Sequence, residues 1–370
     1  MRYRHPLKRI LSLRVPYWDR DETRPAVRWA FCKVSQCHTS ALGAEVYASK
    51  NQERIFYHSC KSRSCPSCGN RANVQWIRER WAALPDVRYK GITFTMPDSL
   101  WSVFHDNPAL AKALPALAAK VIQVRIRAKY GLRVGIIAIL HTFNGKLEFN
   151  AHVHTMVTAG GLCAATDAWI PSVYYDRDRV MKAWRKAVIA LLRTALRAGQ
   201  LRTNRTIDEM ESLLAEQENV WWSIKIQSFE SKMPFLRYAG RYVRRPPIAQ
   251  RRITNIGERT VMFWYKDKKL GRRIYLQLSL EGFIERWAQH IPERYQHAVR
   301  SFGLFAPRSI GQTSAAIFVI LGQKRRRRPK PLSWPFSVKR DFGRDPLLDD
   351  KGDRMRLVRR IAPMASCKSC

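Results

Sequence analysis

The sequence has few acidic residues for its length. Among its 370 residues are 29 Asp and Glu against 67 Lys and Arg, which gives a formal net charge of +38. The basic excess runs along the whole chain and is not confined to one end. A surface that positive repels itself unless it lies against a polyanion, and nucleic acid is the usual one. A soluble basic protein and a ribosome-associated protein are the alternatives that charge alone leaves open.

Long apolar runs are also missing. The longest, near residues 315–321, is far shorter than the roughly 20 residues that a membrane-spanning helix needs. Residues 1–18 are basic but hold no apolar stretch typical of a signal peptide. We therefore expect no membrane association and a reducing, cytoplasmic setting, in which the eight cysteines are metal ligands or buried thiols and not disulfides.

The chain has no internal repeat and no glycine-rich phosphate-binding loop ending in Lys-Ser or Lys-Thr. The second absence argues against a helicase activity. Hydrophobic residues make up 46% of the chain, which is enough for a packed core. The length allows one large domain or two to three smaller ones.

Five of the eight cysteines fall within the first 85 residues, a segment with little helical or strand periodicity. They include a Cys-x4-Cys-x2-Cys group, preceded by two further thiols. A close Cys-x2-Cys pair with more thiols nearby is the spacing of tetrahedral zinc sites. The pattern predicts a small zinc-stapled module but does not decide which residues complete the site.

The clearest local pattern is a hairpin. A buried-strand run over 134–140 and an alternating run over 147–157 flank an Asn-Gly dipeptide, which is typical of a two-residue turn. The alternation places His152 and His154 on the same face of the second strand. Two neighbouring imidazoles can hold one divalent ion, although two half-buried histidines on a sheet face are the simpler alternative.

Two tyrosines lie four residues apart in a helix predicted to start at Pro234 and to end before Pro246. This spacing places Tyr238 and Tyr242 on one helix face. The arginines around them favour phosphate binding and the phenolate form of tyrosine, whereas a buried core stripe is the alternative. The residues expected to bind DNA here are Arg237, Arg241, Arg244 and Arg245.

Other patterns predict helices over 109–129 and 179–198 and a second hairpin over 261–280. A run of basic residues and prolines over 324–331 predicts a mobile tail that binds phosphate.

Together these motifs resemble the rolling-circle transposases of bacterial insertion sequences, which are HUH enzymes of the two-tyrosine type. The similarity spreads over about residues 30 to 310 and depends on the order of the motifs more than on any one of them. The segments that carry it are Ser59–Cys68, Thr93–Pro97, Leu140–Phe143, Asn150–His154 and Tyr238–Ile248.

The resemblance implies an α+β fold. A small zinc-binding and DNA-binding module at 1–85 precedes an HUH-type catalytic domain at 86–310, which has a central antiparallel sheet flanked by helices. A basic, partly disordered tail follows at 311–370. The resemblance also implies a bacterial cytoplasmic protein associated with the nucleoid.

The implied activity is cutting and rejoining of single-stranded transposon ends and target DNA. A Mg²⁺ or Mn²⁺ ion on His152 and His154 polarises the scissile phosphate, and one tyrosine attacks to leave a 5′-phosphotyrosine. The second tyrosine makes a second cut, and the order of Tyr238 and Tyr242 is open. Alternatives are a replication initiator or relaxase with the same chemistry, or a non-catalytic zinc-containing DNA-binding protein derived from a transposase.

HUH sites usually need a third metal ligand, and His141 lies on the right face of the predicted hairpin. A two-residue turn at Asn144-Gly145 sets His141 opposite Glu148, however, roughly 13 Å along the strand from His152. His141 can therefore share the ion only if a bulge shortens that path.

The chain departs from the family pattern in two places. Family members usually carry a Cys-x2-Cys pair where this chain has Ala48–Asn51, and cysteines where Asp349 and Gly352 stand. Zinc is therefore expected on four other residues, with Cys32, His38 or His58 as possible additions. The expected zinc ligands are Cys37, Cys60, Cys65 and Cys68.

Overall fold

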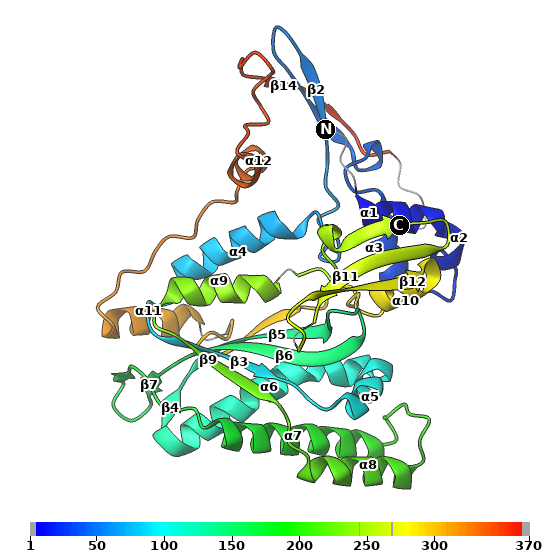
Figure 1. Cartoon of the computed structure of the whole chain (residues 1–370). Helices are drawn as coiled ribbons and strands as arrows, with labels where there is room; N and C mark the ends of the chain where they lie inside the picture. The colour runs from blue at the N-terminus through cyan, green and yellow to red at the C-terminus, as the bar shows by residue number, and fades with distance from the viewer. Residues whose placement is uncertain (1–4, 244, 268, 309, 365–370) are drawn as a thin grey trace.

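A five-stranded antiparallel sheet in the order β13-β5-β6-β3-β9 forms the centre of the molecule (Figure 1). The computed structural model describes residues 5–364 except 244, 268 and 309. The predicted 134–157 hairpin forms the two strands in the middle of the sheet. The bounds are β3 Tyr89–Phe94, β5 Gly135–Phe143, β6 Phe149–Thr158, β9 Ile224–Phe229 and β13 Val299–Gly303.

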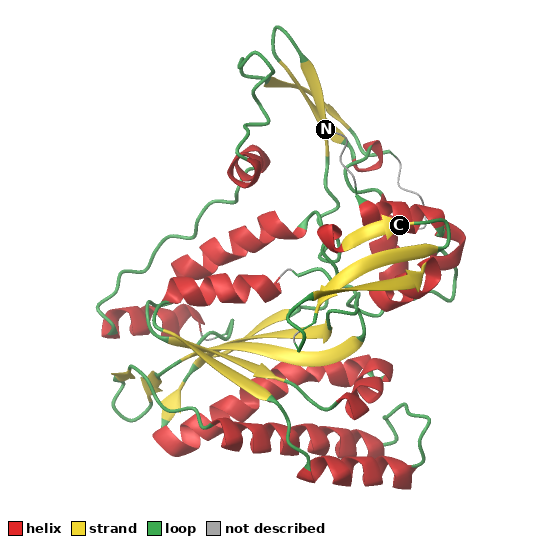
Figure 2. Cartoon of the chain, viewed as in Figure 1, coloured by secondary structure: helices red, strands yellow, loops and turns green. Residues whose placement is uncertain are grey.

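Helices cover both faces of this sheet (Figures 1 and 2). On one face lie α6 (Pro108–Tyr130) and α7 (Arg177–Arg197), followed by α8 (Ile207–Asn219). On the other face α9 (Lys232–Val243) lies next to the strands, and α4 (Gly69–Ala83) packs on α9. These bounds confirm the predicted helices and the expected α+β class.

The alternation in β6 explains why both faces are covered. Val153 and Val157 are fully buried in a core that includes Trp184 of α7. Met156 points to the opposite face and is buried in a second core with Phe235 of α9. Both faces therefore exclude water, and β6 lies in the interior of the domain.

A third core joins distant parts of the chain. Helices α1 (Pro6–Leu13) and α3 (Pro25–Ser35) pack with a second antiparallel sheet and with α10 (Leu280–Ala288). In this core the ring of Phe31 lies 5.0 Å from the ring of Trp287. The N-terminal residues thus share their core with residues 248–291, and packing does not follow a division at 85. The second sheet contains β10 Ile253–Ile256, β11 Thr260–Lys266 and β12 Arg273–Ser279.

The basic run over 324–331, predicted as a mobile tail, forms no helix or strand, whereas the segments on either side of it do. Strand β14 (Arg356–Ile361) pairs with β1 (Ala44–Ala48), which in turn pairs with β2 (Glu53–Tyr57). Two helices precede it, α11 (Ile310–Ile320) and α12 (Trp334–Phe342). The segment is ordered because its apolar side chains find partners elsewhere in the chain. The ring of Trp334, for example, lies 4.7 Å from that of Phe56.

The remaining elements are short, and no described helix is long and apolar enough to cross a membrane. They are α2 Val15–Trp18, α5 Trp101–Asp106, β4 Leu132–Arg133, β7 Gly161–Cys163, β8 Trp169–Ile170 and the 3₁₀ turns Ser40–Leu42, Asp98–Leu100 and Gln250–Arg252.

A set of polar side chains joins the β1–β2 turn to the segment before β14. Asp349 accepts hydrogen bonds from Ser49 Oγ at 2.6 Å and from Asn51 Nδ2 at 3.0 Å. These two hydrogen bonds, the one from Ser49 foremost, hold the pKa of the Asp349 carboxyl well below its usual range. Arg54 adds an ion pair with Asp350 at 2.6 Å. We call this set the polar clasp.

The Asp349→Ala substitution removes the acceptor at the centre of the polar clasp. We expect the segment after α12 to be cleaved faster by trypsin under native conditions, because the segment then keeps the pairing of β14 with β1 and surface ion pairs such as Arg54 with Asp350 but loses the hydrogen bonds to Asp349. Mass spectrometry of the first cleavage products measures the effect. Asp267→Ala, in the β11–β12 turn, is the control. Equal cleavage rates for wild type and Asp349→Ala would show that the clasp does not retain the segment.

Candidate metal and nucleophile site

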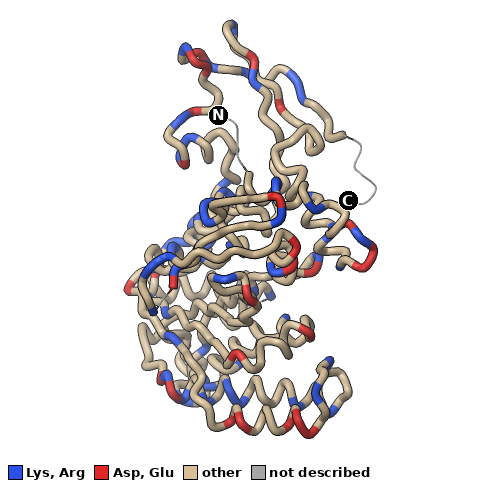
Figure 3. The backbone as a smooth tube through the Cα atoms, turned by 45° about the vertical axis from the view of Figure 1, so that its right-hand side comes forward, with Lys and Arg blue, Asp and Glu red and all other residues tan. Residues whose placement is uncertain are grey.

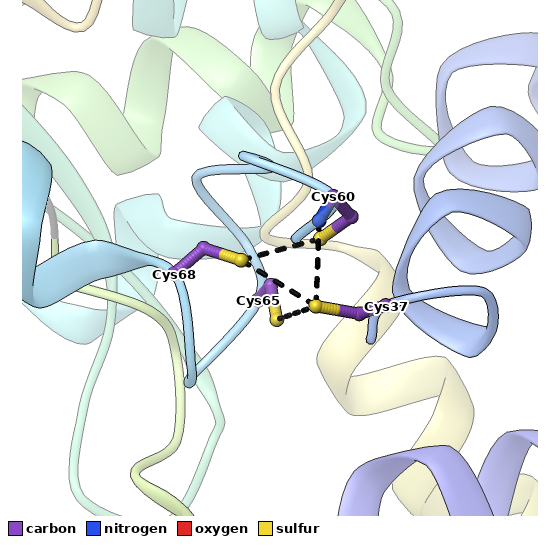
Figure 4. Close-up of side chains that lie close together, drawn as sticks. All are labelled: Cys37, Cys60, Cys65 and Cys68. Carbon is purple, nitrogen blue, oxygen red and sulfur yellow. Dashed lines mark hydrogen bonds between the residues drawn. The ribbon is translucent and has the colours of Figure 1, made fainter. Parts of the chain in front are cut away.

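Four cysteines converge where α3 ends and α4 begins (Figure 4). The sulfur of Cys37 lies 3.5 Å from that of Cys68 and 3.8 Å from that of Cys65, and Cys60 lies 3.6 Å from Cys68. Sulfurs bound to one tetrahedral zinc, at about 2.3 Å each, are roughly 3.8 Å apart. All four residues expected as zinc ligands therefore lie around one point.

Hydrogen bonds among the thiols shift their pKa values in opposite directions. Bonds from Cys37, Cys60 and Cys68 lower the pKa of Cys65 far below its ordinary value, whereas bonds with the other three cysteines, together with burial, raise the pKa of Cys60. Thiolates are the form of cysteine that binds metal. One thiol of the cluster is therefore stabilised as the thiolate by its neighbours.

None of the three additional ligands left open by the sequence belongs to the cluster. Cys32 is disulfide-bonded, so the expectation that no cysteine forms a disulfide was wrong. His38 Nδ1 lies 3.2 Å from the carbonyl oxygen of Tyr57, and His58 Nδ1 lies 3.1 Å from that of Leu42. The residue that sequence reasoning missed is His5, whose Nε2 lies 3.6 Å from Cys65 Sγ. No spacing rule signals it, because its approach results from the packing of α1 against α3.

A second cluster lies on the sheet face beneath α9. It consists of His141 from β5 and His152 and His154 from β6, with one ligand atom of each within 4.8 Å of the others. His141 stands directly opposite His152 in the strand register. The structure therefore brings the third histidine to the pair.

This register corrects the two-residue turn predicted at Asn144-Gly145. Phe143 pairs with Phe149, and a bulge lies between His141 and Phe143, so the connection is longer than predicted. The Asn144 side chain accepts the backbone N–H groups of Lys146 at 2.8 Å and of Glu148 at 3.1 Å, and it stabilises this wider loop. The bulge and the longer loop remove the separation of roughly 13 Å that a tight turn imposes.

Each imidazole is held by a hydrogen bond through one of its nitrogens. His152 Nδ1 lies 2.8 Å from the carbonyl oxygen of Asn150, and His154 Nδ1 lies 3.1 Å from Thr93 Oγ1. His141 Nε2 lies 2.8 Å from the carbonyl oxygen of Tyr242. Histidines that ligate metals are typically oriented in this way, through the nitrogen that does not face the ion.

Burial keeps His141 in its neutral form. The side chain is 2% exposed, and burial lowers its pKa well below the ordinary value, with further lowering by His152 and His154. A neutral imidazole can donate its lone pair to a metal at any physiological pH.

Both tyrosines of α9 lie against this cluster. The Tyr242 ring stacks on that of His154 with centroids 3.7 Å apart, and the Tyr238 ring lies 5.1 Å from that of Tyr242. Burial raises the pKa of Tyr238 to about 12, although a hydrogen bond with Thr93 opposes the rise. Tyr238 can approach the sheet because residue 91 is glycine, whose missing Cβ would stand 3.0 Å from the Tyr238 ring.

The expected DNA-binding arginines are spread around the end of α9. Arg237 and Arg241 are exposed, and the Arg241 guanidinium lies 5.1 Å from the centre of the Tyr238 ring. Arg245 is exposed and stands 5.7 Å from the Phe143 ring centre. Arg244 lies outside the described residues. Lysines and arginines also occur throughout the rest of the molecule (Figure 3).

Comparison with known proteins decides the family. The model described as "Transposase zinc-binding domain" matches residues 11–96, and the one described as "Putative transposase" matches residues 135–312. The chain is 31% identical over 306 residues to a transposase for insertion sequence element IS801 of Pseudomonas savastanoi pv. phaseolicola. The aligned region covers 78% of this chain and 72% of that protein. The chain belongs to this transposase family.

A second relative agrees with the assignment. The transposase is 28% identical over 313 residues to a protein of Sinorhizobium fredii named "Putative transposase y4qJ", over 80% of this chain and 79% of that protein. No solved structure matches it significantly. The zinc-binding family match and the four-cysteine cluster together support Zn²⁺ at the N-terminal part of the transposase, and its function implies DNA as partner.

Cys65→Ser tests the zinc site directly. We expect the zinc content of the purified transposase to fall from about one ion per chain toward zero, because a serine hydroxyl stays protonated and is a poor zinc ligand. Elemental analysis measures the ratio. Cys163→Ser, at the end of β7, is the matched control and should keep its zinc. Full zinc occupancy in Cys65→Ser would rule out this ligand set.

Proposed function

We propose that the transposase cuts and rejoins single-stranded DNA by HUH chemistry, with Tyr242 as the first nucleophile and Tyr238 as the second. The observation that carries the proposal is the stacking of the Tyr242 ring on His154, at 3.7 Å, beside three converging imidazoles. A tyrosine so close to a metal-binding face can reach a phosphate that is held there.

The donor set fits a divalent ion. Three neutral imidazoles would supply three donors to a divalent ion, and Mg²⁺ and Mn²⁺ would both also accept phosphate oxygens of the DNA. We propose that His141, His152 and His154 hold this ion. When bound, it polarises the scissile phosphate and stabilises the charge that develops on it. Since imidazole is a softer ligand than oxygen, we expect Mn²⁺ to bind more tightly than Mg²⁺.

The tyrosine carries the covalent step. Its phenolic oxygen loses a proton and forms a bond to phosphorus, while the bond from phosphorus to the 3′ oxygen breaks and that oxygen takes up a proton. The products are a 5′-phosphotyrosine and a free 3′-hydroxyl. Rejoining reverses the step and needs no ATP, because the phosphodiester energy is kept in the tyrosine link. Arg241, beside Tyr238, offers charge to hold the DNA backbone near the second nucleophile.

Tyrosine variants separate this proposal from DNA binding without catalysis. With Mn²⁺ and labelled single-stranded oligonucleotides from the transposon ends, we expect wild type to form a covalent adduct that survives denaturing electrophoresis. Tyr242→Phe should form none, because the nucleophilic oxygen is gone. Tyr238→Phe should still form the first adduct but fail in strand transfer, because the second cut needs a second phenol.

The control for these variants is Tyr275→Phe, which removes a phenol that is 57% exposed on β12. It should match wild type in both assays. Salt-sensitive DNA binding by wild type with no adduct under Mg²⁺ or Mn²⁺ would refute the proposed chemistry and favour a non-catalytic binding protein.

His141→Ala tests the third ligand. We expect the Mn²⁺ concentration that gives half-maximal adduct to rise by roughly tenfold to a hundredfold, since the variant loses one of three protein ligands. A titration of adduct yield against Mn²⁺ measures the shift, and His297→Ala, exposed between α10 and β13 and outside the cluster, is the control. An unchanged Mn²⁺ requirement would leave His152 and His154 as the only histidine ligands.

A further inference from the structure

A pocket of about 330 Å³ opens beside the histidine cluster. It lies between the β5–β6 hairpin, the cysteine-bearing loop before α4, and the segment that follows α10. His141 is part of its wall, so the pocket continues directly from the proposed catalytic face. Its size falls within the roughly 300–1,000 Å³ typical of ligand sites. We call it the hairpin pocket.

Aromatic rings form one wall of the hairpin pocket. The ring of Phe143 lies 5.2 Å from His141 and 5.6 Å from His290, and Phe149 lies 5.2 Å from His105. All five of these side chains line the pocket. His141 and His290 are buried, so Phe143 and Phe149, which are partly exposed, are the rings on which an unpaired base can stack.

The charged residues of the hairpin pocket are mainly arginines. Its lining contains four arginines and two acids. Both acids have basic partners, because Glu293 forms an ion pair with Arg24 and Asp106 lies 2.8 Å from His105. The basic side chains of the lining therefore outnumber the acidic ones, and this excess of positive charge fits a phosphate group. The arginines other than Arg24 are Arg63, Arg202 and Arg245.

Arg63 comes from the zinc-binding part of the chain. It lies between Cys60 and Cys65, and its neighbours Ser62 and Ser64 are buried. The four converging cysteines hold this loop in place (Figure 4). Arg63 lies close enough to the histidine cluster for its positive charge to act on His141. Burial is the main cause of the lowered pKa of His141, and the charge of Arg63 lowers this pKa further.

We propose that the hairpin pocket binds one nucleotide of the single-stranded DNA next to the scissile phosphate, and that Arg63, positioned by the cysteine cluster, contacts its phosphate. The base stacks on the aromatic wall, and Arg245 contacts the same strand from the end of α9. This inference rests on the proposed function, since it assumes that a scissile phosphate lies on the histidine face. It makes the zinc site a part of the DNA-binding surface and not only a support for the fold.

Salt-dependent DNA binding by Arg63→Ala tests the inference. In the zinc-loaded full chain, we expect single-strand affinity to fall by roughly tenfold and the slope of log K against log salt to decrease by about 0.7, the effect of one lost phosphate contact. Fluorescence anisotropy of labelled transposon-end oligonucleotides at several KCl concentrations gives both values. Arg197→Ala, at the end of α7, removes the same charge outside the pocket and should leave the slope unchanged.

The zinc content of the variant, measured in parallel, shows whether a weaker affinity results from the missing contact of Arg63 with DNA or from unfolding of the cysteine loop. Should Arg63→Ala lose zinc, Arg63→Gln keeps most of the side-chain length and removes only the charge, and it is expected to show the same smaller slope. Wild-type affinity and slope in the zinc-loaded variant would overturn the inference.

The outcome is also distinguishable from failure of the proposed chemistry. If wild type forms the covalent adduct and the Arg63 variants bind DNA as wild type does, only the hairpin pocket is refuted. If the salt slope of DNA binding decreases in the Arg63 variants but neither wild type nor any variant forms a covalent adduct, the pocket binds DNA and the proposed phosphotyrosine chemistry is wrong.

Discussion

The loop between β5 and β6 is the constraint on which the rest of the site depends. A two-residue turn would hold His141 opposite Glu148 and away from the other histidines. The wider loop, stabilised by the Asn144 side chain, and the bulge after His141 place that residue opposite His152 instead. His141 in turn hydrogen-bonds to the carbonyl oxygen of Tyr242. One change of strand register therefore brings the three histidines together and ties the tyrosine helix to them.

Long-range packing joins the cysteine cluster to the part of the chain that carries the histidine cluster. The N-terminal helices share a core with the β10–β12 sheet, and the cysteine loop lies against the hairpin pocket. In another part of this region, side-chain hydrogen bonds from Ser49 and Asn51 to Asp349 join the two segments at which the chain departs from the cysteine pattern of the family that it resembles. The two segments lie next to each other although both lack cysteines, and the hydrogen bonds of the polar clasp connect them.

Local patterns predicted most individual elements well. Helices expected over 109–129 and 179–198 occur at Pro108–Tyr130 and Arg177–Arg197, because helical periodicity and capping are properties of neighbouring residues. The strand that follows the basic run was not predicted, for the opposite reason. Strand β14 pairs with β1, some 300 residues away, and Trp334 contacts Phe56. Neighbouring residues carry no sign of such distant partners. The mobility expected of the run itself, over 324–331, stays a prediction.

The sequence by itself determined the polyanionic partner, the spacing of the zinc ligands, and the shared faces of His152 with His154 and of Tyr238 with Tyr242. Each of these follows from composition or from a period of two or four residues. Only the tertiary structure decided that His141 joins the histidines, that His5 approaches Cys65, and that Arg63 lines the hairpin pocket. Periodicity tells which face a side chain occupies, whereas strand register and the docking of distant segments decide which faces meet.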